Sequence, residues 1–143
     1  MTAETITGLV DARYDGPHTP DTVADAAYAV AGLVRYLNNA TSAGNDRDTL
    51  KYATAIHNIL GGLEAAAHGL DQLLRQLADA AERQSDNPTL YDDRRDPATY
   101  PAARTARDLA GRLDTVRGTA AALAGGLAAA RSYSVHLGNS VPE

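Results

Sequence analysis

The sequence contains no cysteine, tryptophan or phenylalanine, and it has a single methionine. The absence of cysteine excludes disulfides, zinc–thiolate sites and thiol nucleophiles. With the two largest apolar side chains missing, the core has to be built from Leu, Val, Ile and the 29 alanines. Such small residues favour closely spaced helices, and strand formers never alternate over a useful length. The sequence therefore predicts an all-α fold in one domain over residues 1–143.

Clustered positive charge and long apolar runs are also missing. The formal net charge is −5, and Lys51 is the only lysine, whereas nucleic-acid binding requires a basic surface. No apolar run reaches the ~20 residues of a membrane-spanning helix. Acids occupy the positions near the N-terminus where a signal peptide carries bases. We therefore expect a cytoplasmic protein with neither a nucleic-acid nor a membrane partner.

Three main helices are predicted, at about residues 20–38, 46–83 and 99–137. Thr19 is the expected N-cap of the first, and Pro20 suits its first helical position. A polar linker over residues 84–98 separates the second helix from the third, with a separate turn at Asp96-Pro97. Residues 1–18 form an N-terminal extension, in which the pattern allows a short helix from about Ala3 to Ala12.

Apolar residues recur in steps of three and four along all three helices, which predicts an elongated antiparallel bundle. In the second helix the expected contact residues are Ala53, Ile56, Leu60, Leu63, Ala67, Leu70, Leu74, Leu77 and Ala81. In the third they are Leu109, Leu113, Val116, Ala120, Leu123, Leu127, Ala130, Ser134 and Leu137.

The first helix is too short to cover the far end of the hairpin that the two long helices form. Leucines gather at that end, namely Leu70, Leu74, Leu77, Leu109 and Leu113. Either the N-terminal segment or a second subunit has to cover them. We predict that these five residues belong to an interface.

Two further features indicate contact surfaces, and for the first of them the partner is either the first helix or another copy of the chain. Gly118 and Gly125 lie within thirteen uncharged residues, on the side of the third helix that should meet water. Each glycine costs a helix about 1 kcal/mol relative to alanine, so a compensating close contact is expected. Tyr28 and Tyr36 share the outer side of the first helix, and tyrosine is common at interfaces.

No constellation for catalysis, cofactor binding or metal binding is present. Serines lack a nucleophile motif, and the glycine pairs lack the setting of a phosphate-binding loop. Glu64 and His68, four residues apart, could bind one ion, but the sequence has no Glu-x-x-His repeat of the kind that bundle metal sites use. Arg104, Arg107, Arg112 and Arg117 are expected to pair with acids such as Asp71 and Asp79.

The string from Arg35 to Thr41, RYLNNAT, resembles a segment of small alanine-rich actinobacterial proteins of unassigned role. In those proteins a first helix with this ending precedes two longer helices. The resemblance implies a source and a helical fold, and it carries no catalytic residue.

These patterns predict a non-enzymatic structural or adaptor protein that acts through protein–protein contact, with itself as the partner in a homodimer or larger assembly. Two alternatives remain open. One is a helical bundle that binds a small molecule or a metal, with or without enzymatic activity. The other is a regulator that acts on nucleic acid.

Overall fold

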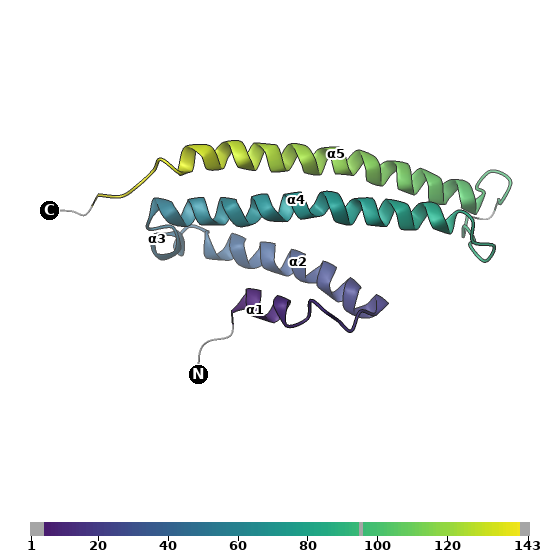
Figure 1. The fold of residues 1–143 in the computed structure, drawn as a ribbon, viewed down its shortest axis with the longest axis horizontal. Coiled ribbons are helices and arrows are strands. Elements are labelled where there is room, and N and C mark those ends of the chain that lie inside the picture. The colour runs from purple at the N-terminus through teal and green to yellow at the C-terminus, as the bar shows by residue number, and fades with distance from the viewer. Residues whose placement is uncertain (1–4, 95, 141–143) are drawn as a thin grey trace. The chain divides into compact units, whose positions relative to one another are not determined.

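A computed structural model describes residues 5–94 and 96–140, and within them every regular element is a helix. The elements in chain order are α1 (Ile6–Asp11), α2 (Pro20–Ala40), α3 (Asp46–Thr49), α4 (Ala53–Gln84) and α5 (Ala102–Ser134) (Figure 1). The predicted all-α fold is confirmed. The chain divides into two units, Met1–Thr49 and Leu50–Glu143.

In the first unit, α2 begins where its capping residues predict. The backbone N–H of Thr22 donates to Thr19 Oγ1 at 3.2 Å, and the N–H of Thr19 donates back to Thr22 Oγ1 at 2.9 Å. This reciprocal pair satisfies two backbone donors at the helix start. Pro20 occupies the first helical position, as predicted. The short helix allowed near the N-terminus is α1, which Thr5 caps by accepting from Gly8 N at 3.1 Å; residues 1–4 lie outside the described part of the chain.

The predicted helix over 46–83 is wrong at its start, because residues 50–52 are not helical. The single turn α3 precedes this break, and α4 begins only at Ala53. Thr49 Oγ1 donates to the carbonyl of Ala40 at 2.6 Å, which ties α3 back to the end of α2. Asn139 Oδ1 accepts from the N–H of Ala53 at 2.8 Å. The first turn of α4 is therefore capped by a residue 86 positions away in the sequence.

The third predicted helix, 99–137, is also shorter than expected, because α5 covers Ala102–Ser134. The Asp96 carboxylate accepts from the N–H groups of Ala98 and Thr99 at 3.1 and 3.3 Å and forms the separate turn that was predicted there. After this turn, Pro101 stands at the N-cap position of α5. The linker between the long helices is therefore 85–101 rather than 84–98.

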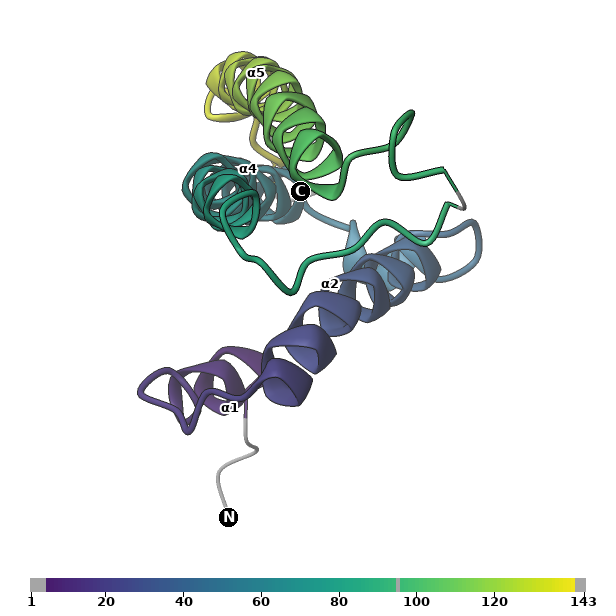
Figure 2. The ribbon, with the colours of Figure 1, turned by 90° about the vertical axis from the view of Figure 1, so that its right-hand side faces the viewer.

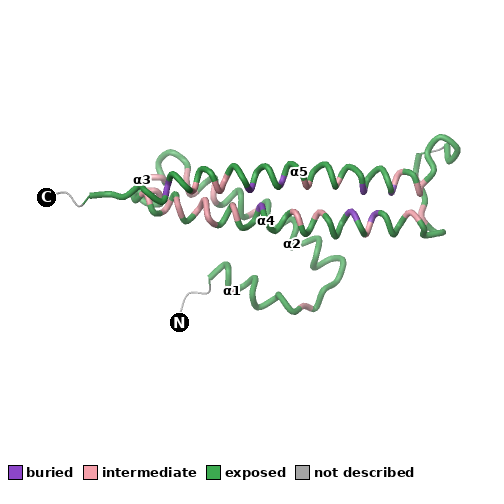
Figure 3. Tube along the Cα trace, turned by 45° about the horizontal axis from the view of Figure 1, so that its top comes forward, coloured by how far each residue is buried: buried purple, intermediate pink, exposed green. Residues whose placement is uncertain are grey.

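In the second unit, α4 and α5 pack side by side as an antiparallel hairpin (Figures 1 and 2). We call the end joined by residues 85–101 the closed end, and the opposite end the open end. At 32 and 33 residues, each helix is about 48 Å long. The buried side chains lie where the two helices face each other (Figure 3).

The contact between α4 and α5, here called the seam, follows a heptad pattern. From α4 it contains Ala53, His57, Leu60, Glu64, Ala67, Asp71, Leu74, Ala78 and Ala81. From α5 it contains Ala106, Ala110, Leu113, Arg117, Ala120, Ala124, Leu127, Arg131 and Ser134. All eighteen are buried or half-buried, and every apolar residue buried in the described chain is an alanine. A seam of alanines lets two helix backbones approach closely, as the composition predicts.

The predicted seam is correct at alternate positions and wrong at those between. Leu60, Ala67 and Leu74 of α4 and Leu113, Ala120 and Leu127 of α5 lie in it as expected. The large residues expected between them are replaced by their C-terminal neighbours. These large residues are Ile56, Leu63, Leu70 and Leu77 in α4, and Leu109, Val116 and Leu123 in α5, all of which are exposed. Small and charged residues enter the seam instead, since alanines occupy little space and the charges pair across it.

Gly61 makes room for one of these charged residues. A Cβ atom at Gly61 would lie 3.3 Å from Nε of Arg131, whereas a Cβ at Gly62 would meet nothing within 4 Å. Gly62→Ala is therefore expected to stabilise the hairpin by up to about 1 kcal/mol through helix propensity alone. Gly61→Ala has the same gain in propensity but must displace the guanidinium, so it should stabilise less or destabilise. The free energy of unfolding in urea measures both; equal stabilisation by the two variants would contradict this packing role.

Candidate protein-interaction surface

Most of the exposed large aliphatic side chains of the two long helices form one stripe on each helix, and Leu73, 46% exposed, lies outside it. In α4 the stripe is Ile56, Leu63, Leu70 and Leu77, with exposed fractions of 42, 37, 38 and 47%. In α5 it is Leu109, Val116 and Leu123, with exposed fractions of 53, 48 and 52%. Members of each stripe are seven residues apart, which keeps them in line along a helix.

Both stripes lie on the same side of the hairpin. In each helix the stripe residue comes three positions after a seam residue, and the next seam residue comes four positions after it. Successive side chains point about 100° apart around a helix axis. A residue three positions further along the chain therefore points about 60° to one side of the starting residue, and a residue four positions further along points about 40° to the other side. The stripe thus flanks the seam in the same rotational sense on both helices. Because the helices are antiparallel, both stripes turn to one side, and we call these seven residues the apolar face.

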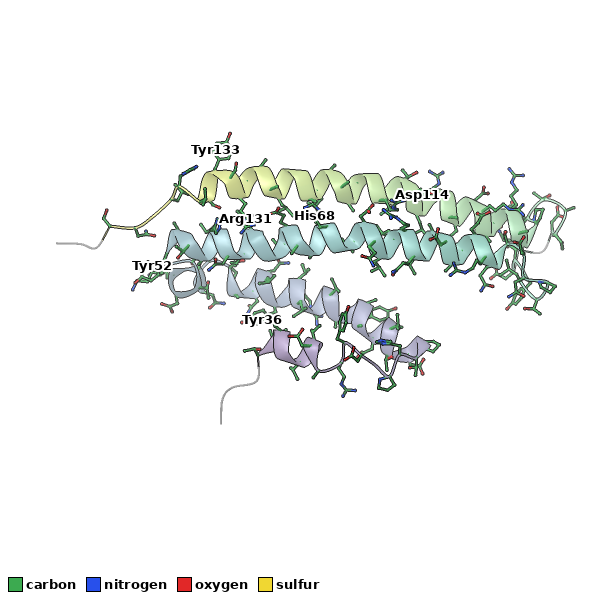
Figure 4. The ribbon with its side chains drawn as sticks, in the orientation of Figure 1. Tyr36, Tyr52, His68, Asp114, Arg131 and Tyr133 are labelled. Carbon is green, nitrogen blue, oxygen red and sulfur yellow. The ribbon has the colours of Figure 1, made fainter. Side chains whose placement is uncertain are left out.

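Charged groups take the protected positions that the large residues leave. Arg117 Nε donates to Asp71 Oδ1 at 3.1 Å and its Nη1 donates to Asp114 Oδ1 at 3.0 Å, and these hydrogen bonds raise the pKa of Arg117, with Asp114 the larger cause. Arg131 Nη1 donates to Glu64 Oε2 at 3.2 Å (Figure 4). The predicted pairing with acids of the second helix is confirmed for Arg117, which meets Asp71, and for Arg107, which meets Glu82 at 3.8 Å. Arg104 instead pairs with Asp108 of its own helix at 3.9 Å.

A histidine–serine contact completes the polar part of the seam. His57 Nδ1 lies 2.9 Å from Ser134 Oγ. The Ser134 hydroxyl donates its proton to the carbonyl of Arg131 at 2.9 Å. Ser134 is only 5% exposed, so this pair joins the two helices at the open end rather than facing a cavity. Nothing in the sequence pattern singles it out, because the two residues are 77 positions apart.

The predicted interface residues fall into three groups. Leu70, Leu77 and Leu109 lie on the apolar face, 38, 47 and 53% exposed. Leu74 and Leu113 lie half-buried in the seam, and Leu113 packs on the cluster of Ala78, Ala81 and Ala110. These two leucines hold the hairpin together, so a substitution at either tests folding before it tests association.

The third group does not belong to the apolar face. A Cβ atom at Gly118 or at Gly125 would meet nothing within 4 Å, so the expected contact along this side of α5, with the first helix or with another copy, stays a prediction. Tyr28 and Tyr36 belong to α2 in the other unit and are 81 and 59% exposed; Figure 4 labels Tyr36. Their predicted interface role likewise stays a prediction.

At the closed end, residues of the linker and of α5 form a hydrogen-bonded cluster. The Asp92 side chain is 6% exposed and accepts two side-chain hydrogen bonds from Arg94 and one from Thr105 Oγ1, the last at 2.6 Å. The Arg94 guanidinium also donates to Thr105 at 2.9 Å and stacks on Tyr100, 4.1 Å from the ring centre. The hydrogen bonds from Arg94, followed by that from Thr105, hold the pKa of Asp92 far below its usual value. The cluster therefore fixes the linker on the start of α5.

A pocket of about 550 Å³ opens beside this cluster. Its walls come from the end of α4, the linker and the first turns of α5. The apolar part of the lining is Ala81, Leu90, Ala102, Ala106 and Leu109. Leu109 also belongs to the apolar face, so the pocket and the face are continuous.

Other candidate chemistry is sparse in the described residues. The Glu64–His68 pair is present at 3.9 Å, but Glu64 is held by Arg131. No group of three or more His, Asp or Glu suited to a metal ion occurs in residues 5–94 and 96–140. No helix in this part of the chain is long and apolar enough to cross a membrane. The chain matches no protein-family model, no curated protein and no solved structure.

The Asp92 cluster predicts a pH-dependent stability. A carboxylate whose pKa falls on folding stabilises the fold above its unfolded pKa of 3.8, and this contribution is lost as the pH falls below that value. Asp92→Asn should therefore lower the urea midpoint at neutral pH, and the gap to wild type should narrow between about pH 4 and pH 2. Asp86→Asn, an exposed carboxylate in the same linker, controls for loss of charge. A gap that persists unchanged at pH 2 would contradict the assigned role of Asp92.

Proposed function

We propose that this protein is a non-enzymatic structural or adaptor protein that acts through protein–protein contact and self-association, with the apolar face as its contact surface. One observation carries the proposal. Seven large apolar side chains, 37 to 53% exposed, line one side of a hairpin whose own seam is filled with alanines and ion pairs. Contiguous apolar surface of this kind marks interaction sites in proteins.

The magnitude of the burial supports association between copies. Full burial of a Leu, Val or Ile side chain is worth about 1.5–3 kcal/mol. Since about half of each side chain is already covered, completing the burial of seven gives about 5–10 kcal/mol for each copy. Two copies that share their faces gain about 10–20 kcal/mol, against an association cost of about 4–15 kcal/mol. The gain exceeds the cost over most of these ranges, which supports a dimer held by this face.

Leu70→Glu tests this proposal at the centre of the apolar face. We expect the wild-type chain, 15.0 kDa, to sediment as a dimer or larger species at tens of micromolar. The variant should remain helical but shift to monomer, because an unpaired carboxylate would be buried in the contact. Leu74→Glu is unsuitable, since Leu74 lies in the seam and its loss would open the hairpin.

Gln72→Glu provides the matched control. Gln72 is exposed on the same helix, two residues from Leu70 and outside the apolar face, so the same charge there should leave the mass unchanged. A wild-type chain that stays monomeric across this concentration range would overturn self-association. A Leu70→Glu variant that associates as well as wild type would show that the contact lies elsewhere.

A further inference from the structure

We infer that α4 of one copy packs antiparallel against α4 of a second copy, around a two-fold axis that crosses the helices near residue 68. This inference rests on the proposed self-association and names the element that makes the contact and its orientation. Three observations carry it. They are a second heptad repeat on α4, uncharged residues on both sides of that repeat, and the match between its large and small residues when two copies are opposed.

The second repeat, here called the outer repeat, runs along α4 in alternate steps of three and four. It consists of Ile56, Ile59, Leu63, Ala66, Leu70, Leu73, Leu77 and Ala80. Ile59 and Ala80 are half-buried, and the other six are exposed. Six of the eight are leucine or isoleucine, and this spacing of large aliphatic residues is the pattern of a helix that packs along another helix.

The outer repeat points in a direction different from that of α5. Each of its residues immediately precedes a seam residue, as Leu70 precedes Asp71 and Leu73 precedes Leu74. Because successive side chains point about 100° apart, the outer repeat is turned by about 100° from the seam. This is close to a right angle, as for the two neighbours of a helix in a four-helix bundle. The sequence of α4 therefore suits a second neighbouring helix in addition to α5.

The residues that flank the outer repeat carry no charge. On the side away from α5 they are Ala55, Gly62, Gly69 and Gln76, and on the seam side they are Leu60, Ala67, Leu74 and Ala81. A partner recognised by its charge would find no group of opposite sign here, whereas a second copy of this acidic chain, with a formal net charge of −5, meets no charge of its own sign. A Cβ atom at Gly62 or Gly69 would meet nothing within 4 Å, so a helix can approach this flank closely. The flanks therefore favour a second copy as the occupant.

The outer repeat is complementary to itself when two copies run antiparallel. With the axis near residue 68, which is the middle of Ala53–Gln84, the two helices overlap along their whole length. The facing pairs are then Ala66 with Leu70, Ala80 with Ile56, Ile59 with Leu77, and Leu63 with Leu73. Each alanine meets a large side chain, which fills the space between the helices. In a parallel pair each residue meets its own copy, so Ala66 would face Ala66 and leave a gap.

The same axis also covers the part of the apolar face that belongs to α5. A two-fold axis perpendicular to the helices places α4 against α4 and α5 against α5. The stripe of α5, formed by Leu109, Val116 and Leu123, then turns to the interior between the two hairpins. The resulting four-helix bundle has antiparallel neighbours throughout, and it buries all seven residues of the apolar face as well as Ile59 and Leu73.

Cross-linking tests the orientation directly, because the chain contains no cysteine. Full-length Ile59→Cys and Leu77→Cys variants are treated with a short thiol-reactive cross-linker, each alone and after equilibration as a mixture. We expect a covalent dimer from the mixture and none from either variant alone, because residue 59 of one copy lies about 27 Å from residue 59 of the other in this arrangement. A mixture of Ile59→Cys with Gln72→Cys is the control, since Gln72 points about 160° away from Leu70 and should give no covalent dimer.

Leu73→Glu tests whether the outer repeat is part of the contact. Leu73 is 46% exposed and lies in the outer repeat but outside the apolar face. By sedimentation equilibrium we expect this variant to raise the dissociation constant on the order of 100-fold, because a carboxylate would be buried without a partner. Gln72→Glu, on the neighbouring position, should change it less than about threefold.

The outcomes separate this inference from the proposed function. A wild-type chain that never associates overturns the proposed function and this inference together. A chain that associates but cross-links from Ile59→Cys alone, or not at all from the mixture with Leu77→Cys, overturns the antiparallel contact and leaves self-association standing. The same holds for a dimer that Leu73→Glu leaves unchanged. Circular dichroism checks that the variants fold, and if Leu73→Glu unfolds, the cross-linking pattern decides.

Discussion

The close packing of α4 against α5 on alanine is the constraint on which the rest of the hairpin depends. Every buried apolar residue in the described chain is an alanine, and seven of them share this seam. The seam has room for only four large apolar side chains, Leu60 and Leu74 of α4 and Leu113 and Leu127 of α5. Most of the other large side chains are consequently turned to one side, where they form the apolar face. The close alanine contact thus holds α4 and α5 together and leaves the apolar face exposed.

The charges in the seam fix how the two helices align. Asp71 meets Arg117, and Glu64 meets Arg131, at 3.1 and 3.2 Å. A shift of α5 by one heptad would bring Ala110 or Ala124 opposite Asp71 and leave its charge without the arginine. Alanine seams look alike in every heptad, so apolar contacts alone specify the alignment weakly. Partly buried ion pairs are a well-attested means of specifying such a register, at some cost in desolvation.

The sequence alone predicts the local features of this fold and about half of its seam. The all-α class, the Thr19 cap with Pro20, and the turn at Asp96 follow from residues that act on their immediate neighbours. The start of α4 does not, because its cap comes from Asn139. The hydrophobic periodicity predicts that Ile56 and Leu63 lie in the seam, whereas in the structure their neighbours His57 and Glu64 lie there. The prediction fails because it assigns the more hydrophobic of two neighbouring residues to the contact. Two long-range contacts, Glu64 with Arg131 and His57 with Ser134, show which neighbour lies inward.

The cap that Asn139 provides to α4 also has a consequence for the order in which the chain is made. Protein synthesis proceeds from the N-terminus, so Ala53 leaves the ribosome long before Asn139 does. Until then the first N–H of α4 has no protein partner, because Tyr52 at the N-cap position supplies no side-chain hydrogen bond. Water serves the exposed N–H of Ala53 in the meantime, and the protein cap arrives only with the return of the chain along α5. The cap of α4 is therefore supplied by a residue that lies beyond the end of α5.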